Sequence, residues 1–307
     1  MKRYVLSLLF SMFSFFCISQ LPVVSSGSIA RLENFQSKYI TPRNIDIWLP
    51  DGYSASKKYS VLYMHDGQML YDTAATWNHQ SWDVDDVLAK LLKEKKIRNV
   101  IVVGVWNGGN TRHGDYFPQK PFELLTKAWQ DSLYLSERPG GASIFNNVKV
   151  NSDNYLKFIV SELKPYIDKN YPTLKEKADT FIAGSSMGGL ISLYAICEYP
   201  KVFGGAACLS THWPGIFTLD NNPMPAAFIK YLKTHLPDPA SHRIYFDYGT
   251  ETLDAMYPAI QKEVDAVMKS SGFTSKNWIT REFQGETHSE KSWNKRLMIP
   301  MIFLLGR

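Results

Sequence analysis

The sequence predicts an α/β fold, in which a mostly parallel central sheet is covered by helices on both faces. The chain of 307 residues is 45% hydrophobic and 14% aromatic, which is enough for a large core. Short apolar runs rich in β-branched residues recur along the chain, and helical patterns separate most of them. No linker rich in Pro, Ser or Gly divides the chain, so we expect a single domain over residues 20–307.

The first half of the chain predicts three strands and two helices. The runs at 45–50, 59–67 and 99–106 are apolar and rich in β-branched residues, which is typical of strands. Residues 82–95 and 153–169 place apolar residues at helical spacing, which predicts two helices.

The second half of the chain predicts four strands that alternate with four helices. The strands cover residues 179–186, 204–210, 243–249 and 278–283, and the helices cover residues 188–198, 224–234, 254–271 and 289–304. Strands that alternate with helices favour parallel pairing. Ligands of such sheets bind beyond the carboxyl ends of the strands.

Residues 107–152 break this alternation with glycines, prolines and aromatic residues. We expect an irregular excursion over the active site, because substrate lids and walls are commonly built from such segments.

Residues 1–19 have the layout of a secretory signal peptide. Lys2 and Arg3 precede an apolar run that ends near Cys17, and small or polar residues follow. The run is short for a membrane span. We expect cleavage after Ser19 and a periplasmic or secreted protein that has no membrane contact after cleavage. A retained membrane anchor is the alternative, and a lipid anchor on Cys17 fits less well.

Charge and composition exclude several classes of partner. The net charge of +5 falls to +3 when Lys2 and Arg3 are removed, which is too little for a nucleic-acid surface. The seven histidines are scattered, and no Cys-x-x-Cys or His-Glu-x-x-His spacing occurs, so we expect no metal site. Cys197 and Cys208 lie in apolar surroundings and are predicted to be buried thiols rather than a disulfide.

The stretch AGSSMGGL, residues 183–190, contains a G-x-S-x-G match centred on Ser186. It follows a predicted strand and begins a predicted helix, which is the setting of a nucleophile elbow. The flanking glycines suit a strained turn, because side chains there would collide with neighbouring backbone. We therefore predict Ser186 as the nucleophile and Ser185 as a small residue of the turn. The alternative is a glycine-rich helix start without catalysis.

A serine nucleophile needs a base and an acid that orients the base. In the α/β-hydrolase order both follow the serine along the chain. Asp247, Glu251 and Asp254 form an acidic cluster, and His288 is the one histidine downstream of it. Asp247 lies within a predicted strand, whereas the other two follow the strand end. We favour Asp254, although it also suits a helix N-cap, and Glu251 is the alternative.

The oxyanion hole is predicted from two backbone N–H groups. One belongs to Met187, directly after the nucleophile, and the other to Gln68, in the loop after the strand at 59–67. His65 and Asp66 in the same loop resemble a second catalytic pair, and we interpret them as hydrogen bonders that shape the loop.

The chain resembles the esterase family of α/β-hydrolases that includes feruloyl and acetyl xylan esterases, enterochelin esterases, S-formylglutathione hydrolases and mycolyltransferases. The resemblance extends over about residues 35–305, through HDGQMLYD, GSSMGG, FDYGTETLDAMY and GETHSEKSW. It implies an α/β-hydrolase fold and a triad of Ser186, Asp254 and His288, without a cofactor. The usual acid position of feruloyl esterases, three residues after the strand-end glycine, is Thr252 here.

Six side chains are predicted to line the substrate site, because they lie near strand ends or in the excursion. They are Trp82, Trp106, Arg112, Tyr116, His212 and Trp213. The resemblance implies a secreted serine esterase acting on a small-molecule or polysaccharide-linked ester, with feruloyl or acetyl groups of plant polysaccharide as the expected substrates. The alternatives are a trilactone siderophore esterase, a non-catalytic relative and an acyltransferase.

Overall fold

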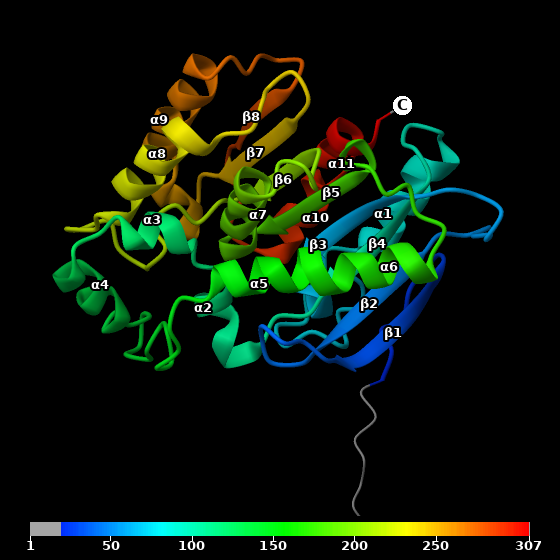
Figure 1. The fold of residues 1–307 in the computed structure, drawn as a ribbon, viewed down its shortest axis with the longest axis horizontal. Helices are drawn as coiled ribbons and strands as arrows, with labels where there is room; N and C mark the ends of the chain where they lie inside the picture. Colours follow the sequence, from blue (N-terminus) through cyan, green and yellow to red (C-terminus); the bar gives the residue numbers. More distant parts are fainter. Residues whose placement is uncertain (1–19, 307) are drawn as a thin grey trace, which may run out of the picture.

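A computed structural model describes residues 20–306, and the predicted signal peptide lies outside the described residues. Within residues 20–306, eight strands form one sheet in the order β1-β2-β4-β3-β5-β6-β7-β8 (Figure 1). All neighbours from β4 to β8 are parallel, whereas β2 is antiparallel to both β1 and β4. The predicted α/β fold with a mostly parallel sheet is confirmed.

The strands are β1 (Ser28–Phe35), β2 (Arg43–Leu49), β3 (Ser60–His65), β4 (Val100–Val105), β5 (Thr180–Ser185), β6 (Gly205–Leu209), β7 (Arg243–Gly249) and β8 (Trp278–Phe283). The seven strands from β2 to β8 confirm the predicted ranges, with ends that differ by about two residues or less. Strand β1 was missed. It is a half-buried edge strand with Arg31 and Glu33 among its apolar residues, so its apolar pattern is weak.

The α-helices are α1 (Val84–Lys93), α2 (Arg112–Tyr116), α3 (Gln119–Glu123), α4 (Lys127–Tyr134), α5 (Ser152–Phe158), α6 (Lys164–Asn170), α7 (Met187–Glu198), α8 (Met224–His235), α9 (Pro258–Ser270), α10 (Glu290–Arg296) and α11 (Met298–Leu305). Short 3-10 turns cover Gly67–Met69 (η1), Gly109–Thr111 (η2), Lys177–Asp179 (η4) and Thr252–Met256 (η5). A π-helical turn at Ile159–Leu163 (η3) joins α5 to α6.

Three predicted helices are divided in the structure. The helix predicted at 153–169 is interrupted by the π-helical turn η3, and the one predicted at 289–304 divides into α10 and α11. The one predicted at 254–271 begins as η5, and α9 then starts at Pro258, a residue that suits the first turn of a helix. The excursion at 107–152 contains α2, α3 and α4, so it is more regular than its composition predicts.

Helices cover both faces of the sheet (Figure 1). On one face α5, α6 and α7 pack against strand residues such as Tyr63 and Val103, and α8 and α9 extend this layer. On the other face α1, α10 and α11 pack against the alternate residues, such as Leu62 and Val102. The inner strands are therefore buried on both faces, as expected for parallel pairing.

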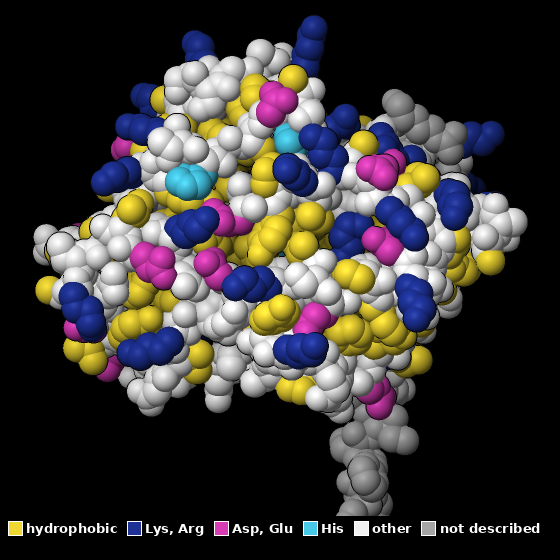
Figure 2. All heavy atoms as spheres, viewed as in Figure 1, with side chains coloured by type: hydrophobic (Ala, Val, Ile, Leu, Met, Phe, Trp, Pro, Cys, Tyr) yellow, Lys and Arg dark blue, Asp and Glu magenta, His cyan; other side chains and the backbone are white. Residues whose placement is uncertain are grey.

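Basic and acidic side chains are interspersed on the face shown in Figure 2. Among residues 20–306, every helix is too short or too polar to cross a bilayer. Cys197 and Cys208 are both buried free thiols, as predicted.

Because β3 to β8 run in one direction, their carboxyl ends lie along a single edge of the sheet, here called the carboxyl edge. The segments that follow these strands include η1 after β3, the β5–α7 turn and η5 after β7. Residues far apart in the sequence are therefore brought together at this edge.

Candidate active site

Ser186 occupies the turn between β5 and α7, at the carboxyl edge. Its φ of 58° and ψ of −125° are strained for a residue with a side chain. Two backbone hydrogen bonds hold the turn: the Ser186 N–H donates to Leu209 O at 2.9 Å, and the His212 N–H donates to Ser186 O at 3.2 Å. The half-buried serine is therefore held by the backbone on both sides of the turn.

Gly184 and Gly188 close this turn by direct backbone contact. A Cβ atom on Gly184 would lie 2.7 Å from the carbonyl carbon and oxygen of Gly188, closer than such atoms can approach. The glycine spacing of the motif therefore follows from the tight return of the chain at Ser186.

Asp254 and His288 are directly paired. The Nδ1 atom of His288 lies 2.5 Å from Oδ1 of Asp254, whose side chain is fully buried. The Oδ2 atom of Asp254 accepts hydrogen bonds from Gly249 N at 2.6 Å and from Ser210 Oγ at 2.5 Å. This pairing leaves Nε2 of His288 as the ring nitrogen available to a serine hydroxyl.

The electrostatics of Asp254 favour its ionised form. Burial by itself raises the pKa of this carboxyl. The opposite effect is larger: the charge of His288 and hydrogen bonds from His288, Ser210 and Gly249 lower the pKa to below its usual value. A carboxylate beside Nδ1 can stabilise a positive charge that develops on the imidazole.

His212 bonds to the backbone of the serine turn and to Tyr257, a ring neighbour of His288. Within the described residues, no hydrogen bond joins the Ser186 hydroxyl to His288. The His212 ring bonds through Nδ1 to the Tyr257 hydroxyl at 2.8 Å, and the Tyr257 ring lies 6.0 Å from the His288 ring. Such hydrogen bonds are often long in enzymes without bound substrate, so the arrangement is compatible with a nucleophile and base.

The other two acid candidates are differently placed. Asp247 is buried in β7 and accepts a hydrogen bond from Arg296 Nη2 at 3.0 Å. Glu251 has an exposed side chain. Thr252, at the usual feruloyl esterase acid position, accepts a hydrogen bond from the His288 backbone N–H at 2.9 Å. This position therefore holds the histidine loop, while Asp254 contacts the ring.

Met187 and Gln68 lie at the ends of neighbouring strands. Met187 is the first residue of α7, and Gln68 lies in η1, after β3, which pairs with β5. The first N–H groups of a helix have no acceptor within that helix, so both can donate to a ligand. The two N–H groups stay the predicted donors for an oxyanion.

His65 and Asp66 bind neighbouring segments, in agreement with a loop-shaping role. Asp66 accepts two hydrogen bonds from Arg112, at 2.6 and 2.8 Å, and one from Asn107 at 2.7 Å. His65 Nδ1 lies 2.7 Å from the Tyr155 hydroxyl. Asp66 therefore anchors the start of the excursion, and Arg112 is engaged in an ion pair.

Four of the six predicted substrate contacts are buried, which corrects the sequence prediction. Trp82 packs against Trp293 with ring centroids 5.4 Å apart, and Tyr116 is fully buried. Trp213 donates from Nε1 to Gln261 at 3.0 Å, and the His212 side chain is 1% exposed. Aromatic residues near strand ends were assigned to the cleft, but their large apolar area places them in the core.

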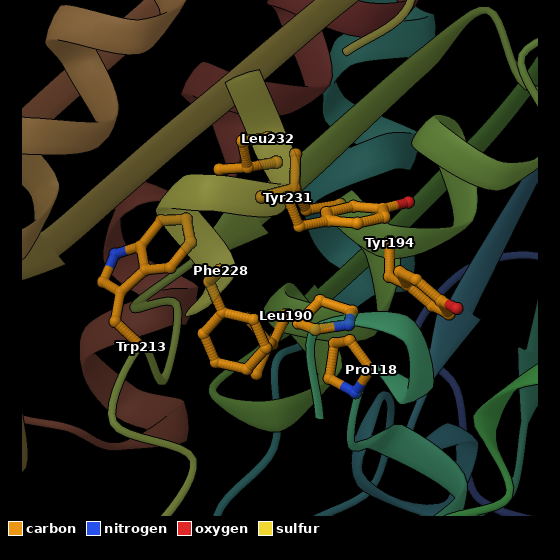
Figure 3. Close-up of a pocket in the computed structure, with 9 residues that line it drawn as sticks. Pro118, Leu190, Tyr194, Trp213, Phe228, Tyr231 and Leu232 are labelled. Atoms are coloured by element: carbon orange, nitrogen blue, oxygen red, sulfur yellow. The ribbon is translucent and has the colours of Figure 1, made fainter. Parts of the chain in front are cut away.

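Trp213 also lines a small apolar recess between the excursion and helices α7 and α8 (Figure 3). Leu190 and Phe228 form other walls of this recess. Its volume of about 10 Å³ holds about one water molecule, which is too little for an acyl group.

Trp106 and Arg112 remain partly exposed. Trp106 lines a recess of about 370 Å³ together with Gln68, beside the carboxyl edge, and donates from Nε1 to Asp46 at 2.8 Å. Among residues 20–306, no group of His, Cys, Asp and Glu has the arrangement of a metal site.

The sequence did not predict the hydrogen-bonded group of residues on the side of Asp254 away from His288. Ser210, directly after β6, bonds to Asp254, and both Trp293 and Arg296 of α10 bond to Ser210. A polar residue at the carboxyl end of a strand was the available signal for Ser210. Nothing local distinguishes the α10 residues from ordinary helix residues.

Residues 38–303 match a protein family described as "Putative esterase". The chain belongs to this esterase family. Membership and the α/β-hydrolase fold identify the protein as a carboxylic ester hydrolase.

Two bacterial proteins are similar to this chain in sequence. The uncharacterized protein YbbA of Bacillus subtilis is 23% identical over 273 residues, which cover 86% of this chain and 93% of that protein. An endo-1,4-beta-xylanase/feruloyl esterase of Xylanibacter ruminicola is 22% identical over 286 residues, covering 89% of this chain and 31% of that protein.

Solved structures of esterases share the fold. A ferulic acid esterase from Anaeromyces mucronatus has a TM-score of 0.62 and 19% identity, covering 92% of this chain and 93% of that chain. The enterobactin esterase of Shigella flexneri has a TM-score of 0.60 and 17% identity, covering 92% of this chain and 60% of that chain.

Proposed function

We propose that the protein is a serine esterase that works through an acyl-enzyme, with Ser186 as nucleophile, His288 as base and Asp254 as the orienting acid. The observation that carries this proposal is the hydrogen bond between His288 Nδ1 and Asp254 Oδ1, 2.5 Å long, at the same edge of the sheet as the strained Ser186 turn. No cofactor is required for this chemistry.

In the proposed reaction His288 Nε2 accepts the proton of the Ser186 hydroxyl as Oγ attacks the ester carbonyl. The N–H groups of Met187 and Gln68 stabilise the resulting oxyanion. Collapse of this intermediate breaks the ester bond, and the leaving alcohol takes the proton from His288. A water molecule then loses a proton to the same ring and releases the acid, which regenerates Ser186.

As substrates we propose feruloyl or acetyl esters carried by plant polysaccharide. A xylanase/feruloyl esterase among the relatives and the ferulic acid esterases among the similar structures support this choice. The fold is shared equally with an enterobactin esterase. Arg112, a predicted substrate contact whose charge would suit a catecholate, is instead paired with Asp66, which favours a neutral ester.

The protein is also proposed to be secreted, with cleavage after Ser19. N-terminal sequencing of protein recovered from the periplasm or medium should then begin at Gln20. A membrane-bound product that keeps Met1 would support a retained anchor instead.

Ser186→Ala tests the proposed chemistry, and Ser185→Ala is its matched control in the same turn. Ser185 is buried at the end of β5, so its loss should leave turnover near the wild-type rate. Ser186→Ala should lower kcat by about 10³-fold or more, because it removes the nucleophile. Hydrolysis of p-nitrophenyl acetate, methyl ferulate and a catecholate trilactone measures both.

The preferred ester separates the substrates. Preference for methyl ferulate or the acetate supports polysaccharide deacylation, and preference for the trilactone would replace it with siderophore hydrolysis. Wild-type protein without Ser186-dependent turnover would indicate a binding protein, or a transferase whose acceptor is missing from the assay.

A further inference from the structure

Ser210 lies behind the candidate acid in a buried, strained position. It directly follows β6, has a φ of 41° and is fully buried. Its hydroxyl lies 2.5 Å from Asp254 Oδ2, 2.9 Å from Trp293 Nε1 and 2.8 Å from Arg296 Nη2. The hydroxyl is thus shared by three side chains from two other segments of the chain.

The chemistry of these partners determines the direction of each hydrogen bond. An indole N–H and a guanidinium can only donate, whereas a serine hydroxyl has one proton and two lone pairs. Trp293 and Arg296 therefore occupy both lone pairs of Ser210. The single proton of Ser210 is left for Asp254, so this hydroxyl has one allowed orientation.

The orientation of the Ser210 hydroxyl determines which oxygen of Asp254 faces His288. The Ser210 hydroxyl and the Gly249 N–H both donate to Oδ2, so that Oδ1 faces His288 Nδ1. An ionised carboxylate can only accept hydrogen bonds, so Nδ1 must carry the ring proton. The lone pair of the neutral ring is then on Nε2, the nitrogen that a serine hydroxyl requires.

Arg296 adds charge to this arrangement. Its side chain is 2% exposed, and Nη2 lies 3.0 Å from Asp247 Oδ1 and 3.9 Å from Asp254 Oδ2. One buried cation thus lies near two buried carboxyl groups. Burial has the largest effect on the pKa of Asp247 and raises it to about 6, although the charge of Arg296 lowers it. The other ionisable groups around Asp254 are Tyr245 and Asp247 on β7, His288, and the bonded pair His212 and Tyr257.

We propose that Ser210, Trp293 and Arg296 form a positioning cluster that, through Asp254, selects the orientation and tautomer of the His288 ring. The proposal rests on the serine esterase function proposed above. None of the three side chains needs to contact the substrate. Their role is to keep Asp254 as an acceptor with Oδ1 aimed at the histidine.

Ser210→Ala tests the cluster, and Ser60→Ala is the matched control. Ser60 is also fully buried and donates to a carboxylate, Asp179 Oδ1, at 2.6 Å, but it begins β3 at the opposite end of the sheet. Each variant removes one hydrogen bond from serine to carboxylate, but Ser210→Ala also removes the acceptor of Trp293 and Arg296. Ser210→Ala should therefore lose more stability than Ser60→Ala, and only Ser210→Ala should change catalysis.

Ser210→Ala should lower kcat about 10- to 100-fold, with KM within about twofold of wild type, because a small misplacement of the base is costly. The profile of kcat/KM against pH should change, because Asp254 loses a donor that favours its ionised form and is paired with the proposed base. The Trp293 ring also contacts the His288 ring, with centroids 5.0 Å apart. Trp293→Phe keeps an aromatic ring at this contact but frees one lone pair of Ser210, and it should cause a smaller loss in the same direction. Proton NMR of the His288 Nδ1–H reports the pairing without turnover.

The outcomes separate this proposal from the proposed function. Unchanged kcat and pH profile in Ser210→Ala, with turnover that still depends on Ser186, would refute the cluster alone. If Ser60→Ala lost as much kcat as Ser210→Ala, Ser210 would have only a general structural role. If Ser210→Ala does not fold, Trp293→Phe decides by the same measurements. If wild type shows no Ser186-dependent turnover, the serine mechanism fails, and an Nδ1–H signal that is the same in wild type and Trp293→Phe would refute the cluster as well.

Discussion

At the scale of single residues, the choice between Asp254 and Glu251 depends on reach and burial. Both follow the end of β7, and local sequence treats them alike. Asp254 is fully buried on η5 and receives hydrogen bonds on both oxygens, whereas Glu251 is exposed. A solvated carboxylate cannot orient an imidazole as firmly, because water competes for each hydrogen bond.

Asp254→Asn and Glu251→Gln therefore should behave differently. The asparagine side chain can present an N–H to His288 and so favour the wrong ring tautomer, which should lower kcat by about 10³- to 10⁴-fold. Glu251→Gln should stay within about twofold of wild type. Steady-state kinetics on the best ester measures both, with circular dichroism to check the fold. The reverse ranking would transfer the role of acid to Glu251.

At the scale of elements, the excursion at 107–152 is tied to the sheet by buried charges. Arg43 on β2 donates from Nη2 to Asp115 on α2 at 3.0 Å, and both side chains are almost fully buried. Thr111 also donates to Asp115 at 2.7 Å. A buried ion pair adds little net stability compared with apolar contacts, but the loss of one partner leaves an uncompensated charge.

Arg43→Met should therefore lower the free energy of unfolding by about 3–5 kcal/mol. Because the pair anchors α2, limited proteolysis should also cut within 107–152 sooner than in wild type. The double variant Arg43→Met/Asp115→Leu should recover most of the stability, since neither charge is then left alone. Urea denaturation of the three proteins measures this, and a double variant as unstable as the single one would contradict it.

At the scale of the whole molecule, three buried histidines make stability depend on pH. Burial lowers the pKa of His65 and of His113 to about 3, and nearby arginines contribute to both shifts. Burial also lowers the pKa of His212 well below its usual value. The folded protein keeps these rings neutral, whereas the unfolded chain protonates them near their ordinary pKa of about 6.5. Stability is therefore lost as the pH falls below about 6.5.

His113→Gln tests this linkage away from the proposed triad. The His113 ring lies between Phe117 and Phe145. Each such histidine should cost about 1.4 kcal/mol per pH unit below 6.5, so the variant should lose about 2 kcal/mol less than wild type between pH 7 and pH 5. Urea denaturation at both pH values measures the difference. His79→Gln, at an exposed histidine, is the control, and equal losses in wild type and His113→Gln would refute the linkage.

Local sequence patterns by themselves determined much of this protein. Apolar runs of strand length predicted β2 to β8, and the glycine spacing around Ser186 predicted the turn between β5 and α7. Both depend on a few consecutive residues, whose backbone preferences and period act over short distances. Strand β1 was not predicted, because an edge strand buries only part of its surface and its apolar pattern is therefore weak.

Only the tertiary structure decided which distant side chains meet. The pairing of Asp254 with His288, the burial of Trp82 and Trp213, and the contact of Ser210 with α10 join segments far apart in the chain. The residue type is the same whether a side chain faces a cleft or the core. Its role therefore depends on which groups the fold packs against it. The sequence therefore predicted the candidate serine and histidine from local motifs, whereas the groups that orient the histidine became visible only when the carboxyl edge was assembled.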